Sequence, residues 1–282
     1  MNSGDEDEIR KYLNLDAAIA TAVEREEPVC PYGMCNGRGT IYRRKENCQC
    51  AARGFARHMC YGAFTCKCSF RNRADEMFRA SVGAHDQNVR LETLVPSNKS
   101  RMPVELQEKY IAALKKDPTG SYAMFGPSGW SKTTYMTALH GYALDQWVET
   151  YGFGRGLVID CPIIRIKVKT LLEQITKFTI DETEDNRPPI LARWIRGRKG
   201  QPNQFRLFLD ELEKVKSTEF KMNELWDIVD ALYEEGGQLV VSGNLKFEDL
   251  EDTNKFLEGF PRRIREICEK HIWNFWKYAE TK

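Results

Sequence analysis

The sequence lacks several features that would assign it to a class at once. Its net charge is close to zero, with 42 Lys and Arg against 41 Asp and Glu, so overall charge predicts neither a nucleic acid nor a membrane as partner. No apolar run approaches the roughly 20 residues that a membrane-spanning helix needs. Residues 5–8 are all acidic, unlike the start of a secretory signal. We therefore expect a soluble, cytoplasmic protein with no membrane association.

No internal repeat and no long low-complexity tract is present, which disfavours a repeat architecture. What the chain does have is length and apolar content. Its 282 residues, 41% of them hydrophobic, allow one large domain or two smaller ones with a sizeable core.

A phosphate-binding loop is predicted where a short apolar run, Tyr122–Phe125, meets a helical pattern. In a strand–loop–helix unit of this kind, backbone N–H groups face the phosphates of a nucleotide, Lys132 reaches the β- and γ-phosphates, and the Thr133 hydroxyl binds Mg²⁺. Ser131 departs from the usual pattern, because it stands where the last glycine before the lysine is expected. A surface turn is the alternative interpretation. The segment reads Gly126, Pro127, Ser128, Gly129, Trp130, Ser131, Lys132, Thr133 and Thr134.

Two further apolar runs end in polar residues of the kind that such a loop requires. The run Gln204–Leu209 is followed by Asp210 and Glu211. In a parallel sheet, ligands gather at the carboxyl ends of strands. We expect Asp210 to hold Mg²⁺ and Glu211 to polarise the attacking water. A third run ends at Asn244, which could touch the γ-phosphate or the water. Adjacent acids are usually a solvated loop, but the three elements together predict an ATPase with a phosphate loop.

Seven of the nine cysteines lie between positions 30 and 68. Two close pairs separated by twelve residues, with a Gly-rich turn and a short strand between them, suit a tetrahedral Zn²⁺ site formed by Cys30, Cys35, Cys48 and Cys50. A disulfide framework is the alternative, although it would be rare in a cytoplasmic ATPase. A second, looser group could hold another ion: His58, Cys60, Cys66 and Cys68. We expect the isolated Cys161 and Cys268 to be core thiols.

The order of these features predicts four segments: an N-terminal helix over 1–27, a zinc-binding module over 28–73, a linker over 74–102 and an ATPase domain over 103–282. Within the last segment, strands near 122–125, 156–160, 206–210 and 238–242 alternate with helical stretches. This alternation is typical of an α/β fold with a parallel sheet flanked by helices.

Two basic regions are compatible with more than one interpretation. Arginines and aromatic residues are interleaved across the cysteine-rich segment, which suits a phosphate backbone with stacking platforms and a protein interface equally well. The segment 187–200 carries four arginines, one lysine and Trp194. Its cations could neutralise the phosphates of a single strand while Trp194 stacks on a base, or Leu191, Trp194 and Ile195 could pack inward below a solvated face.

The sequence also resembles a known family. Five segments look like the core of DnaC/DnaI-type replicative helicase loaders, which are AAA+ ATPases. They are Leu207–Leu212, Glu224–Glu235, Val241–Leu245, the arginine-bearing Pro261–Ile267 and the aromatic Trp273–Trp276. The resemblance covers about residues 90–282, and the cysteine-rich module is similar to that of loaders in phages and Gram-positive bacteria. IstB-type transposition helpers are close cousins of these proteins.

This resemblance implies roles for individual residues and for partners. By this resemblance, Lys132 contacts the phosphate and Thr133 binds Mg²⁺. Asp210 binds the metal, Glu211 acts on the attacking water, and Asn244 is the γ-phosphate sensor. Arg263 becomes the finger that reaches the nucleotide of a neighbouring subunit, so a homo-oligomer with ATP is implied. The implied partners are a hexameric replicative helicase and single-stranded DNA. Ser131 leaves open whether ATP is hydrolysed quickly or serves mainly as an assembly switch.

Overall fold

The computed structural model describes residues 30–32, 35, 40–44, 61–151, 161–173, 205–214, 218–251 and 259–280. The predicted N-terminal helix over 1–27 and the basic segment 187–200 lie outside the described residues, as do Cys48, Cys50, His58 and Cys60. Described residues up to Asn72 belong to one compact unit, and those from Arg73 onward, apart from Tyr151, belong to a second.

The first unit contains a short antiparallel hairpin. Strand β1 (Thr40–Arg44) pairs with β2 (Tyr61–Thr65) so that Thr40 lies opposite Thr65. Helix α3 (Lys67–Ser81) begins directly after β2 and continues past the boundary between the units. The pairing brings the residues after β2 close to those before β1, and this closure is what positions the cysteines described below.

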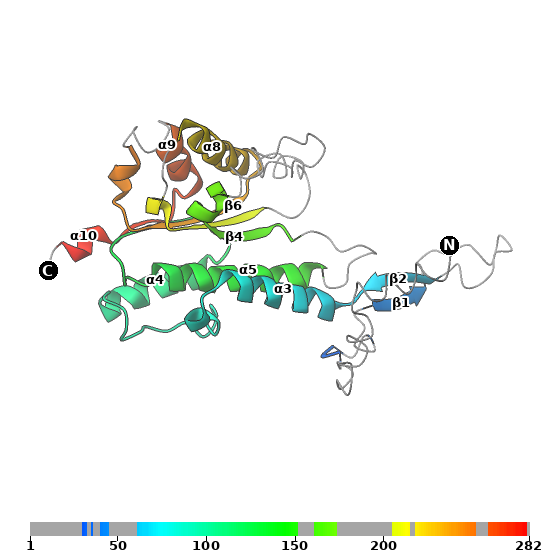
Figure 1. Ribbon diagram of the computed structural model, residues 1–282. Helices are drawn as coiled ribbons and strands as arrows, with labels where there is room; N and C mark the ends of the chain where they lie inside the picture. Colours follow the sequence, from blue (N-terminus) through cyan, green and yellow to red (C-terminus); the bar gives the residue numbers. More distant parts are fainter. Residues whose placement is uncertain are drawn as a thin grey trace, which may run out of the picture. The chain divides into compact units, whose positions relative to one another are not determined.

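The second unit is built around a five-stranded sheet in which all neighbouring strands are parallel (Figure 1). Strands β3 and β6 are buried at every residue, as expected for parallel strands covered on both faces. In spatial order the strands are β4 (Ile163–Lys167), β5 (Arg206–Asp210), β6 (Gln238–Gly243), β3 (Tyr122–Phe125) and β7 (Ile272–Asn274).

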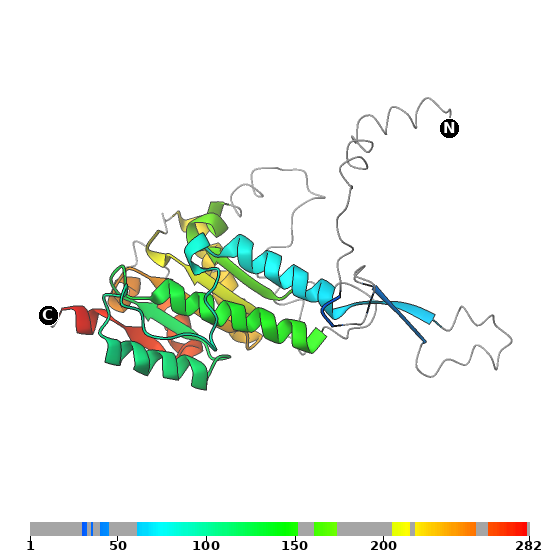
Figure 2. The same ribbon diagram turned by 90° about the horizontal axis from the view of Figure 1, so that it is seen from below.

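Helices cover both faces of this sheet. Helices α4 (Val104–Lys116) and α5 (Lys132–Tyr151) lie on one face, while α8 (Glu219–Glu234) and α9 (Gly259–Ile267) lie on the other (Figures 1 and 2). The main apolar cluster joins α8 and α9 to the sheet. The remaining short elements are η2 (Ala84–Asp86), η4 (Leu212–Lys214), η5 (Phe247–Glu251) and α10 (Trp276–Ala279). Among the described helices, none combines the length and the apolar character that crossing a membrane requires.

Three of the four strands predicted in this unit are confirmed as β3, β5 and β6. The strand predicted near 156–160 falls outside the described residues, and the sheet strand in this part of the chain is β4, a few residues further on. Arg165 and Lys167 interrupt the apolar pattern of β4, whereas 156–160 has a stronger apolar run. Both charged residues pair with acids at the end of β5: Arg165 with Asp210 and Lys167 with Glu211.

Candidate functional site

A cavity of about 290 Å³ lies where the carboxyl ends of β5 and β6 meet the loop between β3 and α5. Every residue predicted for phosphate binding from Ser128 to Thr134 lines it, and so do Asp210, Glu211 and Asn244. The structure therefore brings these predicted residues together from three separate segments. Glu213 and Ser242 also line the cavity, and the sequence alone did not single them out.

The loop has the backbone geometry that lets N–H groups turn toward one point. Gly129 and Ser131 both have left-handed backbone conformations, with φ of 82° and 59°. Gly126 lies so close to Phe275 that an added Cβ would be 2.5 Å from the Phe275 Cβ atom. Helix α5 begins at Lys132, so the free N–H groups and the positive end of its dipole face the cavity. This arrangement suits an anion such as a phosphate.

Lys132 is held inside the loop. Its ammonium Nζ donates hydrogen bonds to the carbonyls of Gly126 (2.7 Å) and Pro127 (2.7 Å) and to Oδ1 of Asn244 (2.8 Å). Only 7% of the residue is exposed. Burial lowers the pKa of Lys132 to about 8, although the charges of Glu213 and Asp210 act in the opposite direction. An incoming phosphate would therefore meet a positive charge that has little water around it.

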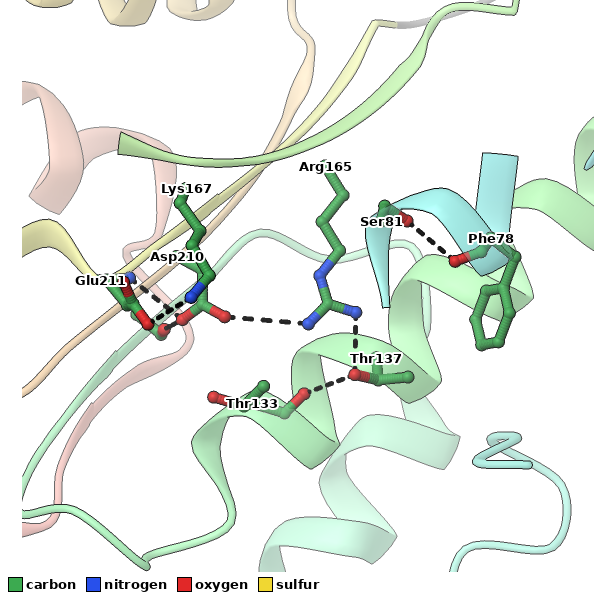
Figure 3. A network of polar contacts seen from close by, with 9 residues as sticks. Phe78, Ser81, Thr133, Thr137, Arg165, Lys167, Asp210 and Glu211 are labelled. Carbon is green, nitrogen blue, oxygen red and sulfur yellow. Dashed lines mark hydrogen bonds and ion pairs between the residues drawn. The ribbon is translucent and has the colours of Figure 1, made fainter. Parts of the chain in front are cut away.

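Asp210 ends β5 and is fixed by contacts to both carboxylate oxygens (Figure 3). Its Oδ1 accepts hydrogen bonds from the Ser242 hydroxyl and from the Glu211 N–H (3.0 Å), and its Oδ2 lies 3.7 Å from Nη2 of Arg165. Because the carboxylate cannot rotate freely, its oxygens are aimed before any cation arrives. Hard oxygen donors such as Asp210 and the Thr133 hydroxyl, both lining the cavity, are the ligands that Mg²⁺ prefers.

Arg165 connects the two sides of this candidate magnesium site. Its Nη1 donates to the Thr137 hydroxyl (2.8 Å), which in turn donates to the Thr133 carbonyl (2.8 Å) (Figure 3). Burial lowers the pKa of the Arg165 guanidinium, while Asp210 partly restores it. The Arg165 side chain, on β4, thus links the end of β5 to the first turns of α5.

Glu211 follows directly after β5 with a left-handed backbone, φ 59°. Its Oε1 lies 2.7 Å from Nζ of Lys167, at the end of β4. The hydrogen bond to Glu211 raises the pKa of Lys167. The carboxylate that the sequence predicts as the catalytic base is therefore paired with a neighbouring cation through one of its two oxygens.

Asn244 contacts the phosphate loop and the acidic segment together. Besides accepting from Lys132, it donates from its backbone N–H (2.9 Å) and from Nδ2 (2.8 Å) to the two oxygens of Glu213. The amide is consequently fixed in the orientation that turns its oxygen toward Lys132. This position suits a group that senses the phosphate next to Lys132.

Arg263 does not line the cavity. It lies on α9, where it donates to Asp230 (2.7 Å) and Glu266 (2.6 Å) and stacks 4.2 Å from the ring centre of Tyr233. These contacts fix the side chain within its own subunit. The role expected for Arg263 involves a second subunit, and it stays a prediction.

Four cysteines converge in the first unit: Cys30, Cys35, Cys66 and Cys68, whose sulfur atoms all lie within 4.8 Å of one another. The Sγ–Sγ distances are 3.7 Å between Cys30 and Cys66 and 3.5 Å between Cys35 and Cys68. A tetrahedral zinc site with Zn–S bonds near 2.3 Å places its sulfurs about 3.8 Å apart. The cluster has the dimensions and the number of soft ligands that fit one zinc ion.

This grouping differs from the one predicted. Among the described residues, Cys30 and Cys35 meet Cys66 and Cys68, because the β1–β2 pairing closes the chain at Thr40 and Thr65. The predicted partners Cys48 and Cys50 lie outside the described residues, so their part in the site stays a prediction. Four sulfurs already complete a tetrahedral site. Burial raises the pKa of the Cys66 and Cys68 thiols, so a bound metal would have to displace their protons.

No family model matches the chain, and no curated protein matches it. Solved structures of similar fold include the DnaC helicase loader, which is 14% identical, with a match that covers 68% of this chain and 100% of the loader at a TM-score of 0.47. Another is AMPPCP-bound DnaA from Aquifex aeolicus, with 12% identity, coverage of 63% of this chain and 48% of DnaA, and a TM-score of 0.44.

A third is the replication initiator DnaA bound to AMPPCP and single-stranded DNA. It is 17% identical, and the match covers 66% of this chain and 49% of the initiator at a TM-score of 0.40. The chain thus spans about half the length of the two initiators. The parallel sheet with its flanking helices and phosphate loop is the α/β arrangement that the sequence predicts.

Proposed function

We propose that this protein is an ATPase that binds ATP with Mg²⁺ at the cavity between the phosphate loop and the ends of β5 and β6. The observation that carries the proposal is the convergence of Lys132, Asp210 and Asn244, from three separate segments, on one cavity of about 290 Å³. Lys132 and the N–H groups of the loop would hold the phosphates. Thr133 and Asp210 would hold Mg²⁺, which supplies charge neutralisation at the phosphates.

Hydrolysis requires Glu211 to orient and deprotonate a water molecule. The carboxylate lines the cavity, but its Oε1 is paired with Lys167 at 2.7 Å. This exposed ion pair would compete with the water for Oε1 of Glu211. Arg263, offered to a neighbouring subunit, would supply positive charge to the transition state and make hydrolysis depend on assembly.

We further propose that the ATPase acts in DNA replication as a helicase loader, with single-stranded DNA as its nucleic-acid partner. The resemblance of the sequence to DnaC/DnaI-type loaders supports this role. A second cavity of about 290 Å³ is lined by Lys169, Lys214 and Lys221 together with Leu172 and Glu173. Its three lysines outnumber the one acid, which pairs with Lys169 at 3.7 Å, so the cavity suits backbone phosphates.

The four-cysteine cluster is proposed to hold a structural zinc ion, and the module that contains it to bind a hexameric helicase. Two other functions use the same core. An IstB-type transposition helper would act on double-stranded DNA, and a nucleotide-gated scaffold would bind ATP with little turnover. Ser131, which occupies a left-handed position that glycine normally fills, is the observation that favours the scaffold.

ATP turnover of the wild type and of Lys132→Ala, measured alone and with single- or double-stranded DNA, tests the proposal. We expect Lys132→Ala to lower turnover by about a hundredfold or more, as loss of a transition-state donor does, and single-stranded DNA to stimulate the wild type. Lys116→Ala, which removes an exposed lysine at the end of α4, is the control and should leave turnover unchanged.

Each alternative function has its own outcome in this experiment. Stimulation by duplex DNA alone would assign the transposition helper. Tight ATP binding without turnover would assign the scaffold. If Lys132→Ala and Lys116→Ala behave alike, the cavity is not the nucleotide site and the proposal is wrong.

A further inference from the structure

Ser131 occupies a backbone position that favours glycine. Its φ of 59° is in the left-handed region, where the Cβ atom of an L-residue is crowded by the following carbonyl. The residue cannot easily relax, because it directly precedes α5 and its carbonyl accepts the Tyr135 N–H at 2.9 Å. Something outside the loop has to stabilise this conformation.

The stabilising group is Ser100. The Ser131 hydroxyl donates to the Ser100 hydroxyl oxygen at 2.8 Å, and the Ser100 hydroxyl donates onward to the Gly129 carbonyl at 3.4 Å. The Arg101 N–H donates to the same Gly129 carbonyl at 2.9 Å. Both left-handed residues of the phosphate loop are therefore held by one segment, residues 97–102, which we call the strap.

The strap is itself fixed to helix α4. Gln107, only 2% exposed, accepts the Ser97 N–H (2.8 Å) and donates from Nε2 to the carbonyls of Ser97 (3.2 Å) and Met102 (2.8 Å). One buried side chain thus binds both ends of the strap. Ser100 is presented to the loop from a rigid support, and it does not touch the cavity itself.

We propose that Ser100 is a positioning residue for nucleotide binding, and that it acts by holding Ser131 in the left-handed conformation that the phosphate loop requires. The inference rests on the proposed nucleotide site. It explains how the chain can carry serine where phosphate loops carry glycine: the hydroxyl of Ser131 supplies a contact that compensates for its Cβ. A glycine at position 131 would adopt the conformation unaided and would not need Ser100.

A double-mutant cycle tests this coupling. The dissociation constant of mant-ATP with Mg²⁺ is measured for the full chain and for Ser100→Ala, Ser131→Ala, Ser131→Gly and the double variant Ser100→Ala/Ser131→Gly. We expect Ser100→Ala and Ser131→Ala each to weaken binding about fivefold, because each removes the hydrogen bond between the two hydroxyls. In the Ser131→Gly background, Ser100→Ala should change the constant by less than twofold, because the shorter bond from the Arg101 N–H still holds the Gly129 carbonyl.

Ser97→Ala is the matched control, since Ser97 lies in the same strap but its hydroxyl only accepts the Lys99 N–H (3.3 Å). Thermal unfolding of every variant shows whether the fold is kept. Equal effects of Ser100→Ala in the serine and glycine backgrounds would overturn the inference, and so would equal effects of Ser100→Ala and Ser97→Ala. If the wild type does not bind mant-ATP, the proposed function is wrong and the inference falls with it.

Discussion

The two candidate sites of this protein are stabilised in different ways. The nucleotide site is attached to a parallel sheet whose strands β3 and β6 are buried along their length, and a large apolar cluster supports it. The cysteine cluster has a core of three buried cysteines, with Tyr32 and Cys35 packed against it. Burial of apolar surface is the main stabilising term of folding, so the first site has ample support of its own and the second has little among the described residues.

Because of this difference, ligand binding makes a different contribution to the structure at each site. At the nucleotide site, hydrogen bonds among protein groups fix Lys132, Asp210 and Asn244 before a ligand arrives, so binding needs little rearrangement. At the cysteine cluster the four side chains contact one another through weak Sγ–Sγ interactions. At the cysteine cluster, metal binding would itself contribute to the free energy of folding.

Removal of metal should produce the largest effect. We expect a chelator to unfold the described residues around the cysteine cluster while the sheet keeps its structure and its affinity for ATP. Hydrogen exchange followed by mass spectrometry would report both regions in one experiment. A purified chain that contains no zinc, or simultaneous loss of both regions, would contradict the contrast between the two sites.

Single substitutions distinguish the two possible zinc ligand sets. Cys66→Ser should abolish zinc binding, whereas Cys48→Ser should keep one zinc ion per chain, because the four described sulfurs already complete a tetrahedral site. Cys268→Ser is the control, since that thiol is buried in the second unit and its Sγ donates to the Leu239 carbonyl at 3.9 Å. Loss of zinc in Cys48→Ser would support the pairing predicted from the sequence.

Glu211→Gln tests the other side of the comparison. The substitution keeps the shape of the side chain but removes the base, so we expect turnover to fall by about a hundredfold or more while ATP binding is kept. The binding site should tolerate it, because the atoms that hold Lys132 and Asp210 include no Glu211 side-chain atom. Glu219→Gln, at an exposed position in the first turn of α8, is the control. Unchanged turnover in Glu211→Gln would exclude it as the base.

Much of the nucleotide site could be predicted from the sequence because its residues sit at the ends of apolar runs. The loop, the Asp210–Glu211 pair and Asn244 each follow a strand that the apolar pattern reveals. Arg165 and Lys167 could not be found this way, since they lie within a strand and break its pattern. Ser100 was hidden for another reason: its partner Ser131 is 31 residues away, and only the fold brings them together.

The cysteine pairing was harder to predict for a physical reason. Close spacing along the chain makes Cys48 and Cys50 natural partners for Cys30 and Cys35, but spacing says nothing about which segments pair as strands. Once β1 pairs with β2, residues 66 and 68 follow the hairpin and meet the first pair. Strand pairing, which a count of intervening residues does not reveal, therefore decides which of the described cysteines meet.

The smallest expected effect is a dependence on pH, and the direction in which ligand binding changes with pH differs between the nucleotide site and the cysteine cluster. Burial lowers the pKa of Lys132 from its ordinary 10.5 to about 8 in the free protein, so the unfolded chain binds this proton more tightly. Stability of the free protein should therefore rise between pH 8 and 10.5, as the buried charge is neutralised. Affinity for ATP should fall over the same range, by up to about tenfold per pH unit, because phosphate requires the charged lysine.

Thermal unfolding and mant-ATP titration between pH 7 and 9.5 measure both slopes, and Lys132→Met should remove them both. Zinc binding should respond in the opposite sense to ATP binding, since the buried thiols of Cys66 and Cys68 have raised pKa values and must lose their protons to the metal. An ATP affinity that does not change with pH would mean that Lys132 keeps its charge throughout. In that case the carboxylates of Glu213 and Asp210 outweigh burial in setting the pKa of the lysine.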